Sequence, residues 1–433
     1  NGSCNSVHSH SQPVRPISNV AECSASAPLG KGRISTVDRY SLRKLLPLLG
    51  NPPVRIVLWN GEEINPVSGS PVATITLRDR KVLLKILANP DLGFGDGYSS
   101  GLIDVNGDLV EFLEMMYRAC TPCREGIFGR FMSRWLFRPK ANSLSGSRDN
   151  IHRHYDIGND FYKLWLDKEL VYTCAYFPTP QTGLEEAQRA KMDHVCRKLR
   201  LQPGQTVIEA GCGWGALARH MARHYGVAVK AFNISHEQIA YARSRAKAEG
   251  LDGRVQFIED DYRSIKGRCD VFVSVGMLEH VGPENYQLLG NVIHRCLNPK
   301  GLGLIHSIGR NRAGRMNPWM EQRIFPGAYL PTLREMMAVF EAGRFSVLDV
   351  ENLRLHYAKT LEHWLRRFDQ QAETIRRMFD ERFVRAWRLY LAGSLAGFTT
   401  GFIQLFQVVF APGRSNEVPW TREHLYSSTN PAR

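Results

Sequence analysis

The sequence predicts an α/β fold in which a doubly wound, mostly parallel sheet follows a small N-terminal α+β domain. From residue 151 onward, short apolar segments alternate with helical runs, which is the pattern of a parallel sheet with its connecting helices. Within this region, the apolar residues 206–208 lead directly into the glycine-rich stretch Glu-Ala-Gly-Cys-Gly-Trp-Gly at 209–215. A strand that ends in such a turn is typical of the first unit of an open α/β sheet. The chain of 433 residues is long enough for more than one domain.

The composition of the N-terminal third of the chain changes twice, which divides it into three segments. Residues 1–36 are polar and rich in Ser, which predicts a disordered tail, and residues 37–123 predict the α+β domain. The elements expected in this domain are a helix at 39–49, strands at 54–59 and 72–77, a helix at 82–87, turns at 91–108 and a helix at 109–117. Residues 124–150 mix basic and aromatic side chains, and they predict either an interfacial membrane helix or a packed linker helix with a Ser/Gly hinge.

Residues 151–412 form the predicted α/β domain, and residues 413–433 form a C-terminal tail. The core strands are expected at 207–210, 228–232, 255–258, 271–275 and 303–307. A helical insertion over the site is expected at 312–400, with helices at 333–341, 361–377 and 381–391, before a last strand at 402–410. The uncharged segment 389–413 could span a bilayer by length, but its glycines and glutamines indicate a helix end, a turn and a buried strand.

The composition is that of a globular protein with an anionic partner. Hydrophobic residues make up 43% and charged residues 23%, and the net charge of +14 favours an acidic membrane surface or nucleic acid over a neutral partner. A solubilising surface is the alternative explanation of the charge. The nine cysteines are irregularly spaced, which indicates a reducing, cytoplasmic compartment. The one CxxC pair, Cys120 and Cys123, has no second pair, so no metal site is expected.

The glycine-rich turn fits two kinds of cofactor, and it could also be a bare structural turn. The spacing of Gly211, Gly213 and Ala216 satisfies a loose dinucleotide fingerprint. A nicotinamide enzyme usually has an acid at the end of the next strand, whereas residues 233–235 here are the neutral Asn-Ile-Ser. The acid Glu209 inside the turn motif is typical of S-adenosylmethionine (SAM) methyltransferases, which the pattern resembles, so the sheet is expected to be of their Rossmann-like type.

Several motifs converge on the carboxyl edge of the predicted sheet. They are residues 154–161, 172–177, 260–263, 274–282, 306–309, 325–327 and 356–361. Together with the glycine-rich turn they resemble the cyclopropane fatty acid synthase family, which includes the mycolic acid cyclopropane synthases, over about 150–412. A weaker similarity at 94–109 extends into the N-terminal domain, which the phospholipid-modifying bacterial members carry. Some plant N-methyltransferases share the catalytic core.

The resemblance implies a reaction and a set of catalytic residues. A cis alkene of an acyl chain attacks the SAM methyl group, a carbocation forms in a pocket that must be dry, and bound bicarbonate removes a proton so that the ring closes. Tyr176, Phe325 and Tyr357 are candidates to stabilise the cation. The residues that match the family's bicarbonate site are Cys174, Glu279, His306, Tyr357 and, through its backbone, Ile308. Glu279 can accept the bicarbonate O–H, while His306 and Tyr357 can donate.

The cofactor contacts of the family carry over to ten positions of this chain. They are Tyr172 and Thr173 at the carboxylate, Gly211 and Gly213 at the turn, Asn233, Ile234 and Gln238 at the ribose, and Asp261, Tyr262 and Arg263 at the adenine. Relatives usually have Thr where this chain has Asn233, and both side chains can bond to a hydroxyl.

The predicted function is therefore SAM-dependent cyclopropanation of unsaturated phospholipid acyl chains. The N-terminal domain is expected to dock lipid or membrane, which would make the protein peripheral on the anionic inner leaflet of a bacterial plasma membrane, and the resemblance implies a homodimer. Two alternatives remain: a methyltransferase of the same core with a methyl-branched, methylene or other small product, and a non-catalytic lipid-binding protein. No motif supports a nucleic-acid partner.

Overall fold

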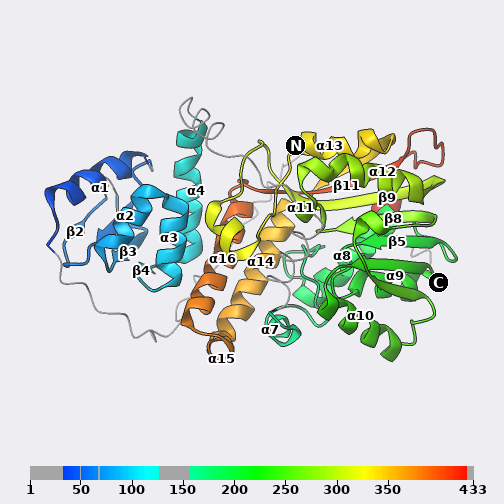
Figure 1. The fold of residues 1–433 in the computed structure, drawn as a ribbon, viewed down its shortest axis with the longest axis horizontal. Coiled ribbons are helices and arrows are strands. Elements are labelled where there is room, and N and C mark those ends of the chain that lie inside the picture. Colours follow the sequence, from blue (N-terminus) through cyan, green and yellow to red (C-terminus); the bar gives the residue numbers. More distant parts are fainter. Residues whose placement is uncertain (1–32, 49, 67–68, 126–156, 427–433) are drawn as a thin grey trace, which may run out of the picture.

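A computed structural model of the chain describes residues 33–48, 50–66, 69–125 and 157–426. Within these ranges the chain forms two sheets, each with its own helices (Figure 1). Nearly all of the predicted linker at 124–150, the tail up to residue 32 and motif residues 154–156 lie outside the described residues.

The N-terminal domain has a four-stranded mixed sheet in the order β2-β1-β3-β4, with β1 parallel to β3. Its elements are α1 (Thr36–Leu48), β1 (Val54–Val57), β2 (Glu63–Ile64), β3 (Ala73–Leu77), α2 (Arg80–Ala88), α3 (Pro90–Ser99), β4 (Ile103–Asn106) and α4 (Leu109–Glu125). The prediction of turns at 91–108 was wrong, because α3 and β4 occupy most of that segment. Asn89 caps α3 with its side chain and Pro90 occupies its first turn. A Cβ on Gly95 would lie 2.3 Å from the Trp319 ring, so this glycine permits a close helix contact rather than a turn.

The large sheet has seven strands in the order β10-β11-β9-β8-β5-β6-β7. They are β5 (Thr206–Ala210), β6 (Ala228–Asn233), β7 (Val255–Glu259), β8 (Cys269–Val275), β9 (Leu297–Gly309), β10 (Phe345–Asn352) and β11 (Gln404–Pro412). Strands β5 to β9 are parallel, and β10 and β11 are antiparallel to their neighbours. The predicted mostly parallel, doubly wound sheet is therefore confirmed.

Helices cover both faces of this sheet. One face packs on α8 (Leu184–Lys198), α9 (Ala216–Tyr225) and α10 (His236–Ala248), and the other on α12 (Tyr286–Cys296) and α13 (Leu333–Ala342). Val207 belongs to the first core and Ile208 to the second, as expected from the alternation of side chains along a strand. The remaining short elements are α7 (Asn159–Lys163), η1 (Tyr262–Ser264), α11 (Leu278–Val281), η2 (Pro283–Asn285), η3 (Met320–Ile324) and α17 (Glu423–Tyr426).

The insertion between β9 and β11 was expected to be helical, and this expectation was wrong in part. It contains the edge strand β10 before α14 (Arg354–Gln370), α15 (Ala372–Met378) and α16 (Glu381–Thr399). No residue of β10 is fully buried, so the strand lacks the apolar pattern that marks a core strand. The helix predicted at 381–391 continues to Thr399 before the chain returns as β11. Among the described helices, none has both the length and the hydropathy for a membrane crossing.

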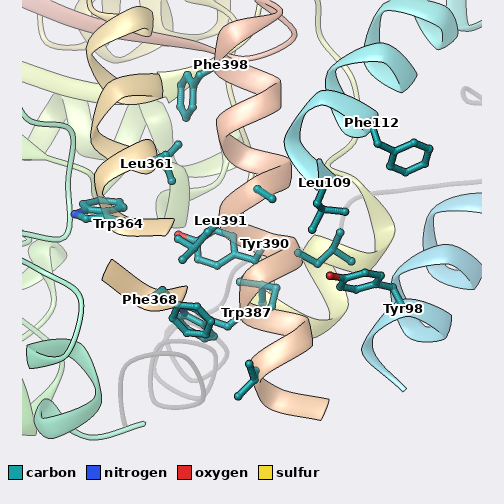
Figure 2. Close-up of a cluster of buried hydrophobic side chains, with 14 of the residues drawn as sticks. Tyr98, Leu109, Phe112, Leu361, Trp364, Phe368, Trp387, Tyr390, Leu391 and Phe398 are labelled. Atoms are coloured by element: carbon teal, nitrogen blue, oxygen red, sulfur yellow. The ribbon is translucent and has the colours of Figure 1, made fainter. Parts of the chain in front are cut away.

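The two domains share one hydrophobic core, which is centred on α16 (Figure 2). Tyr98 of α3 and Phe112 of α4 lie on one side of α16, and Trp364 and Phe368 of α14 lie on the other. Arg385 of α16 donates to the carbonyls of Tyr98 and Ile103 at 2.6 and 2.7 Å and to the Asp104 carboxylate at 3.0 Å. The insertion is therefore the element through which the N-terminal domain is attached to the sheet.

Candidate active site

A cavity opens at the carboxyl ends of β5, β6 and β8, where the glycine-rich turn begins. Its wall comprises residues 170–173, Lys191, Glu209, residues 211–214, Ala216, Leu217, Asn233, Gln238, residues 275–277 and His280. Gly211 has φ +84° and Gly213 has φ +53°, conformations that side-chain-bearing residues rarely adopt. A Cβ on Gly213 would meet no atom within 4 Å, so here the backbone itself faces open space. A ligand can approach the backbone closely at this turn.

Six of the ten predicted cofactor residues line this cavity: Tyr172, Thr173, Gly211, Gly213, Asn233 and Gln238. The amide of Asn233 donates to the Gln238 side chain at 2.6 Å and to the Gly213 carbonyl at 3.3 Å, which holds it across the turn. The hydroxyl of Tyr172 lies 2.7 Å from that of Tyr390 on α16.

The other four predicted cofactor residues do not line the cavity. Ile234 follows Asn233 and bonds to its side chain through the backbone N–H. Asp261 caps the short helix η1 and pairs with Arg263 at 3.0 Å, and the Arg263 guanidinium lies 4.9 Å from the centre of the Tyr262 ring. A hydrogen bond from the Asp260 N–H to the Asn233 carbonyl places this segment beside the cavity wall.

The cavity wall also contains two buried ionisable residues, Lys191 and Glu209, that were not among the predicted site residues. Lys191 of α8 donates to the Thr173 hydroxyl at 2.9 Å, and Glu209 has one carboxyl oxygen without a hydrogen-bond partner among the described residues. Burial lowers the pKa of Lys191 and raises the pKa of Glu209, while their mutual attraction opposes both shifts. Glu209 was recognised only as part of the turn motif. Lys191 carried no signal in the sequence, because a lysine in a helix is usually exposed.

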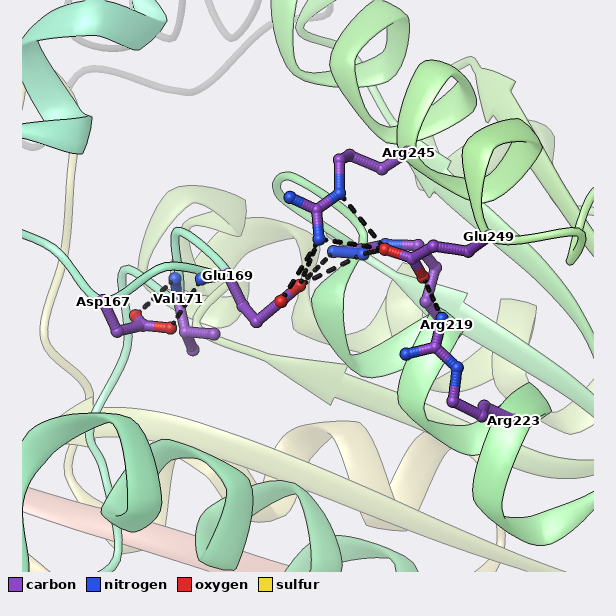
Figure 3. Close-up of polar contacts among 7 residues, drawn as sticks. All are labelled: Asp167, Glu169, Val171, Arg219, Arg223, Arg245 and Glu249. Carbon is purple, nitrogen blue, oxygen red and sulfur yellow. Dashed lines mark hydrogen bonds and ion pairs between the residues drawn. The ribbon is translucent and has the colours of Figure 1, made fainter.

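An ion-pair cluster adjoins the segment 170–173, which forms part of the cavity wall (Figure 3). The Asp167 carboxylate accepts the N–H groups of Glu169 and Val171, which shapes the segment that leads into Tyr172 and Thr173. Glu169 in turn accepts from Arg219 of α9 and from Arg245 of α10. This cluster, which we call the Glu169 cluster, is completed by Glu249 and Arg223. It ties one wall of the cavity to the two helices that follow the glycine-rich turn and β6.

The predicted catalytic residues lie on β9, α11, α14 and the segment before α8. Glu279 accepts the Ile308 N–H at 2.6 Å with one carboxyl oxygen, and its other oxygen is buried without a hydrogen-bond partner in the described part of the chain. His306 precedes Ile308 by two residues on β9, so the two share a face of the strand. Glu279 and Ile308 are therefore in direct contact, and His306 lies two residues before Ile308 on the same strand.

Cys174 and Tyr357 meet through the first residues of α14. The Cys174 thiol lies 4.0 Å from the Leu353 carbonyl, which also accepts the Tyr357 N–H. The Leu353 N–H bonds to Leu405, and Leu405 pairs with Ile308 across the sheet. Both residues thus lie near β9, although neither lines the cavity at the glycine-rich turn.

Burial dominates the electrostatics of the predicted catalytic residues. It raises the pKa of Glu279 to about 7, against the opposing effect of the Ile308 N–H. It lowers the pKa of His306 well below its ordinary range, and the neighbouring Lys191 and Lys198 act in the same direction. Burial also raises the pKa of the Cys174 thiol, so this cysteine is a neutral hydrogen-bonding group rather than a nucleophile.

The three aromatic candidates for cation stabilisation differ in their surroundings. Tyr176 stacks on His194 and on His356, with ring centroids 4.3 and 4.7 Å apart. Two parallel rings at such distances cover both of its faces, which leaves none for a cation. Phe325 contacts Tyr390 edge-on, and Tyr357 stacks on Phe398 at 4.5 Å.

Solved structures with related sequences share the fold of the large domain. The cyclopropane synthase MmaA2 from Mycobacterium tuberculosis matches 62% of this chain and 100% of its own, with a TM-score of 0.59 and 28% identity. The mycolic acid cyclopropane synthase CmaA1, in a complex with SAH and CTAB, matches 61% of this chain and 97% of its own, with a TM-score of 0.58 and 30% identity. The sheet and its glycine-rich turn define the SAM-dependent methyltransferase fold.

Sequence comparison identifies the group within that fold. The family model for mycolic acid cyclopropane synthetase matches residues 142–408, and a model for a domain of unknown function matches residues 41–123. A "probable fatty acid methyltransferase" of Pseudomonas putida is 37% identical over 86% of this chain and 96% of its own. The cyclopropane-fatty-acyl-phospholipid synthase of Escherichia coli K12 is 36% identical over 81% and 91%. The chain belongs to the mycolic acid cyclopropane synthetase family, whose enzymes are SAM-dependent fatty acid methyltransferases and cyclopropane synthases.

Proposed function

We propose that this protein adds a methylene group from SAM across the cis double bond of an unsaturated phospholipid acyl chain, and so forms a cyclopropane ring. The observation that carries the proposal is the state of Glu279, whose second carboxyl oxygen is buried without a partner among the described residues. Such an oxygen favours a ligand that donates an O–H group, since an unpaired buried acceptor is costly. Bicarbonate has that O–H group, and when bound it supplies the base for the last proton.

The charges in the cavity at the glycine-rich turn support SAM as the donor. Its wall contains one buried ammonium, Lys191, and one buried carboxyl, Glu209. Together they complement the carboxylate and ammonium groups of an amino acid, which the methionine part of SAM carries. Gln238, whose carbonyl oxygen is held by the Asn233 amide, offers its NH₂ group to a hydroxyl, and the backbone of Gly213 permits close approach. When bound, SAM supplies the methyl group.

The burial of the remaining residues favours carbocation chemistry. Cys174, Tyr357 and Phe398 belong to one hydrophobic cluster with Trp364 and Leu361, and all five are at most 8% exposed. Water in such a site would trap a carbocation as an alcohol, so its exclusion protects the reaction. Glu279 would orient the anion, with His306 and Tyr357 as donors to it.

We propose that the N-terminal domain docks the enzyme on an anionic inner leaflet. Among the described residues of α1 and α2, the large apolar side chains of Val37, Tyr40, Leu84 and Leu87 are exposed by 66, 63, 48 and 38%. The same helices expose Arg43, Lys44, Lys81 and Lys85. Apolar groups flanked by cations suit a surface of anionic lipid, to which each nearby cation contributes about 1 kcal/mol.

The test is an assay with the full chain, SAM, bicarbonate and vesicles of dioleoyl phosphatidylglycerol. We expect acyl chains that are heavier by one CH₂ in mass spectra, with ring protons in NMR spectra rather than those of a methyl branch or an exocyclic methylene. Glu279→Gln should bind SAM but form no product, and vesicles of dioleoyl phosphatidylcholine should react more slowly. SAM binding without any heavier chain would refute the proposed reaction, and methyl-branched chains would assign the protein to the methyltransferases of the family.

A further inference from the structure

A row of polar side chains crosses three strands beside the predicted catalytic residues. Glu351 of β10 pairs with Gln407 of β11, and Gln407 pairs with His306 of β9, so the three residues lie directly opposite one another. Residues paired across neighbouring strands project from the same face of a sheet. Lys198 of α8 lies against that row, and it donates to Glu351 at 2.6 Å and to Gln407 at 2.8 Å. At most 2% of His306, Gln407 and Lys198 is exposed.

The ammonium of Lys198 determines how the Gln407 amide is oriented. An ammonium group has three donors and no acceptor, so the Gln407 atom that faces it must be the carbonyl oxygen. Burial lowers the pKa of Lys198, but the Glu351 carboxylate 2.6 Å away opposes that shift and favours the ammonium form. Hydrogen bonds from His194 and Lys198 bring the pKa of Glu351 to about 2 despite its burial. The amide NH₂ of Gln407 then points to the other side, toward His306.

The orientation of that amide determines the tautomer of His306. The Gln407 nitrogen lies 3.0 Å from Nδ1 of the histidine. An NH₂ group can only donate, so Nδ1 must accept with its lone pair and cannot carry a proton. The ring proton is therefore on Nε2. Burial and the nearby lysines lower the pKa of His306, so the ring stays neutral and carries only this one proton.

We propose that Lys198 and Gln407 are positioning residues that hold His306 as the neutral Nε2–H tautomer, so that it always presents a donor to the reaction site. This inference rests on the proposed function, in which His306 donates to a bound anion. With the other tautomer, a lone pair on Nε2 would face the anion and repel it. The lysine thereby acts on the reaction through two side chains, without a contact to substrate or cofactor.

The direct test is the ¹⁵N NMR spectrum of the full chain with ¹⁵N-labelled histidine, without substrate. The His306 signals are assigned by their loss in His306→Gln. In the wild-type protein we expect Nδ1 to appear as an unprotonated ring nitrogen and Nε2 as a protonated one throughout neutral pH. A proton on Nδ1 would overturn the proposal, whatever the protein catalyses.

Two variants test the link to turnover. Gln407→Leu removes the donor to Nδ1, and the double variant Lys198→Met with Glu351→Gln removes the constraint on the amide while conserving net charge. In both we expect the signals of two exchanging tautomers and a fall in kcat of about tenfold or more, with the KM for SAM within about twofold of wild type. Gln404→Leu is the matched control, because Gln404 is a buried glutamine of the same strand that bonds to Asn352 and Gly401 instead.

The outcomes separate this proposal from the proposed function. A fixed Nε2–H tautomer that persists in both variants, or a changed tautomer with unchanged kcat, would overturn the role of Lys198 and Gln407. If the wild-type protein forms no cyclopropane, the proposed function fails on product analysis alone, while the NMR spectrum still decides how the histidine is held.

Discussion

At the scale of single residues, the ionisation of the buried Glu279 lowers the free energy of unfolding. Burial raises its pKa from the ordinary value of 4.5 to about 7. The folded state therefore binds a proton more tightly than the unfolded state between these values. The contribution of this group to stability is fully present below about pH 4.5, and it is lost as the pH rises through about 7.

Replacing Glu279 by Gln should remove this pH dependence. We expect the free energy of unfolding of Glu279→Gln, relative to wild type, to improve by about 1–3 kcal/mol between pH 5 and pH 8, because the amide has no proton to lose. Urea unfolding at both pH values measures the change. Glu373→Gln, at an exposed ion pair with Arg376 and Arg377, serves as a control with no such trend. If the difference in unfolding free energy between Glu279→Gln and wild type were the same at pH 5 and pH 8, the role of burial would be contradicted.

The sequence allowed candidate catalytic residues to be named, but it did not reveal the side chains that surround them. Cys174, Glu279, His306 and Tyr357 could be named because each lies in a motif. Lys191, Lys198 and Gln407 could not be named, because a lysine inside a helix and a glutamine inside a strand acquire meaning only when α8 packs on the sheet. Hydrogen bonds between residues 101 and 209 positions apart follow from topology, which no local pattern encodes.

At the scale of elements, the Glu169 cluster holds the segment that forms one wall of the cavity at the glycine-rich turn. Residues 167–173 have no regular secondary structure, and Leu170 has φ +56°. The shape of this segment depends on the two N–H bonds to Asp167 and on the bridge from Glu169 to α9 and α10. A loop that is held by ion pairs can be loosened without damage to the sheet.

Glu169→Gln should therefore weaken the binding of SAM more than it weakens the fold. We expect the Kd for SAM to rise about three- to tenfold, which corresponds to about 0.7–1.4 kcal/mol, with kcat little changed. Isothermal titration with SAM and steady-state kinetics measure the two quantities. Glu381→Gln also removes an arginine partner, but from an exposed pair on α16, and it should leave the Kd unchanged. Equal effects of both variants would show that the cluster has no special role at the cavity.

Elements were predictable where most of their residues are buried. Strands β5 and β8 are almost wholly buried, and their predicted bounds are within two residues of the observed ones. For β9 the prediction at 303–307 found only the buried centre of a strand that begins at Leu297. The edge strand β10 was missed because it is only half-buried and pairs with one neighbour. The helix α3 was missed because Gly93, Gly95 and Gly97, which suggest turns, are instead sites of close packing against other elements.

At the scale of the whole molecule, Arg385 and Arg388 of α16 both make polar contacts with the N-terminal domain, and Arg385 makes three hydrogen bonds to it. The guanidinium of Arg385 satisfies two backbone carbonyls and one carboxylate, and it lies 4.4 Å from the centre of the Tyr98 ring. A second pair, Arg323 with Asp96, joins the same domain to the insertion at 2.9 Å.

Arg385→Ala should destabilise the protein by about 2–4 kcal/mol, since it leaves buried acceptors without a partner. Chemical denaturation measures this loss, and an earlier separate transition of the N-terminal domain is expected with it. Arg366→Ala, at an exposed arginine of α14 that pairs with Glu362 of the same helix, should change stability by less than about 0.5 kcal/mol. A neutral Arg385→Ala variant would show that apolar contacts alone hold the domains together.

The contact between the hydroxyls of Tyr172 and Tyr390 gives this arrangement a thermodynamic consequence. Tyr172 belongs to the wall of the cavity at the glycine-rich turn, and Tyr390 belongs to α16, on which the N-terminal domain packs. Under the proposed function, this contact links SAM binding to docking on a bilayer, and a linkage between two binding equilibria is reciprocal. A bilayer that changes the affinity for SAM by some factor would therefore itself be bound more or less tightly, by the same factor, once SAM is bound.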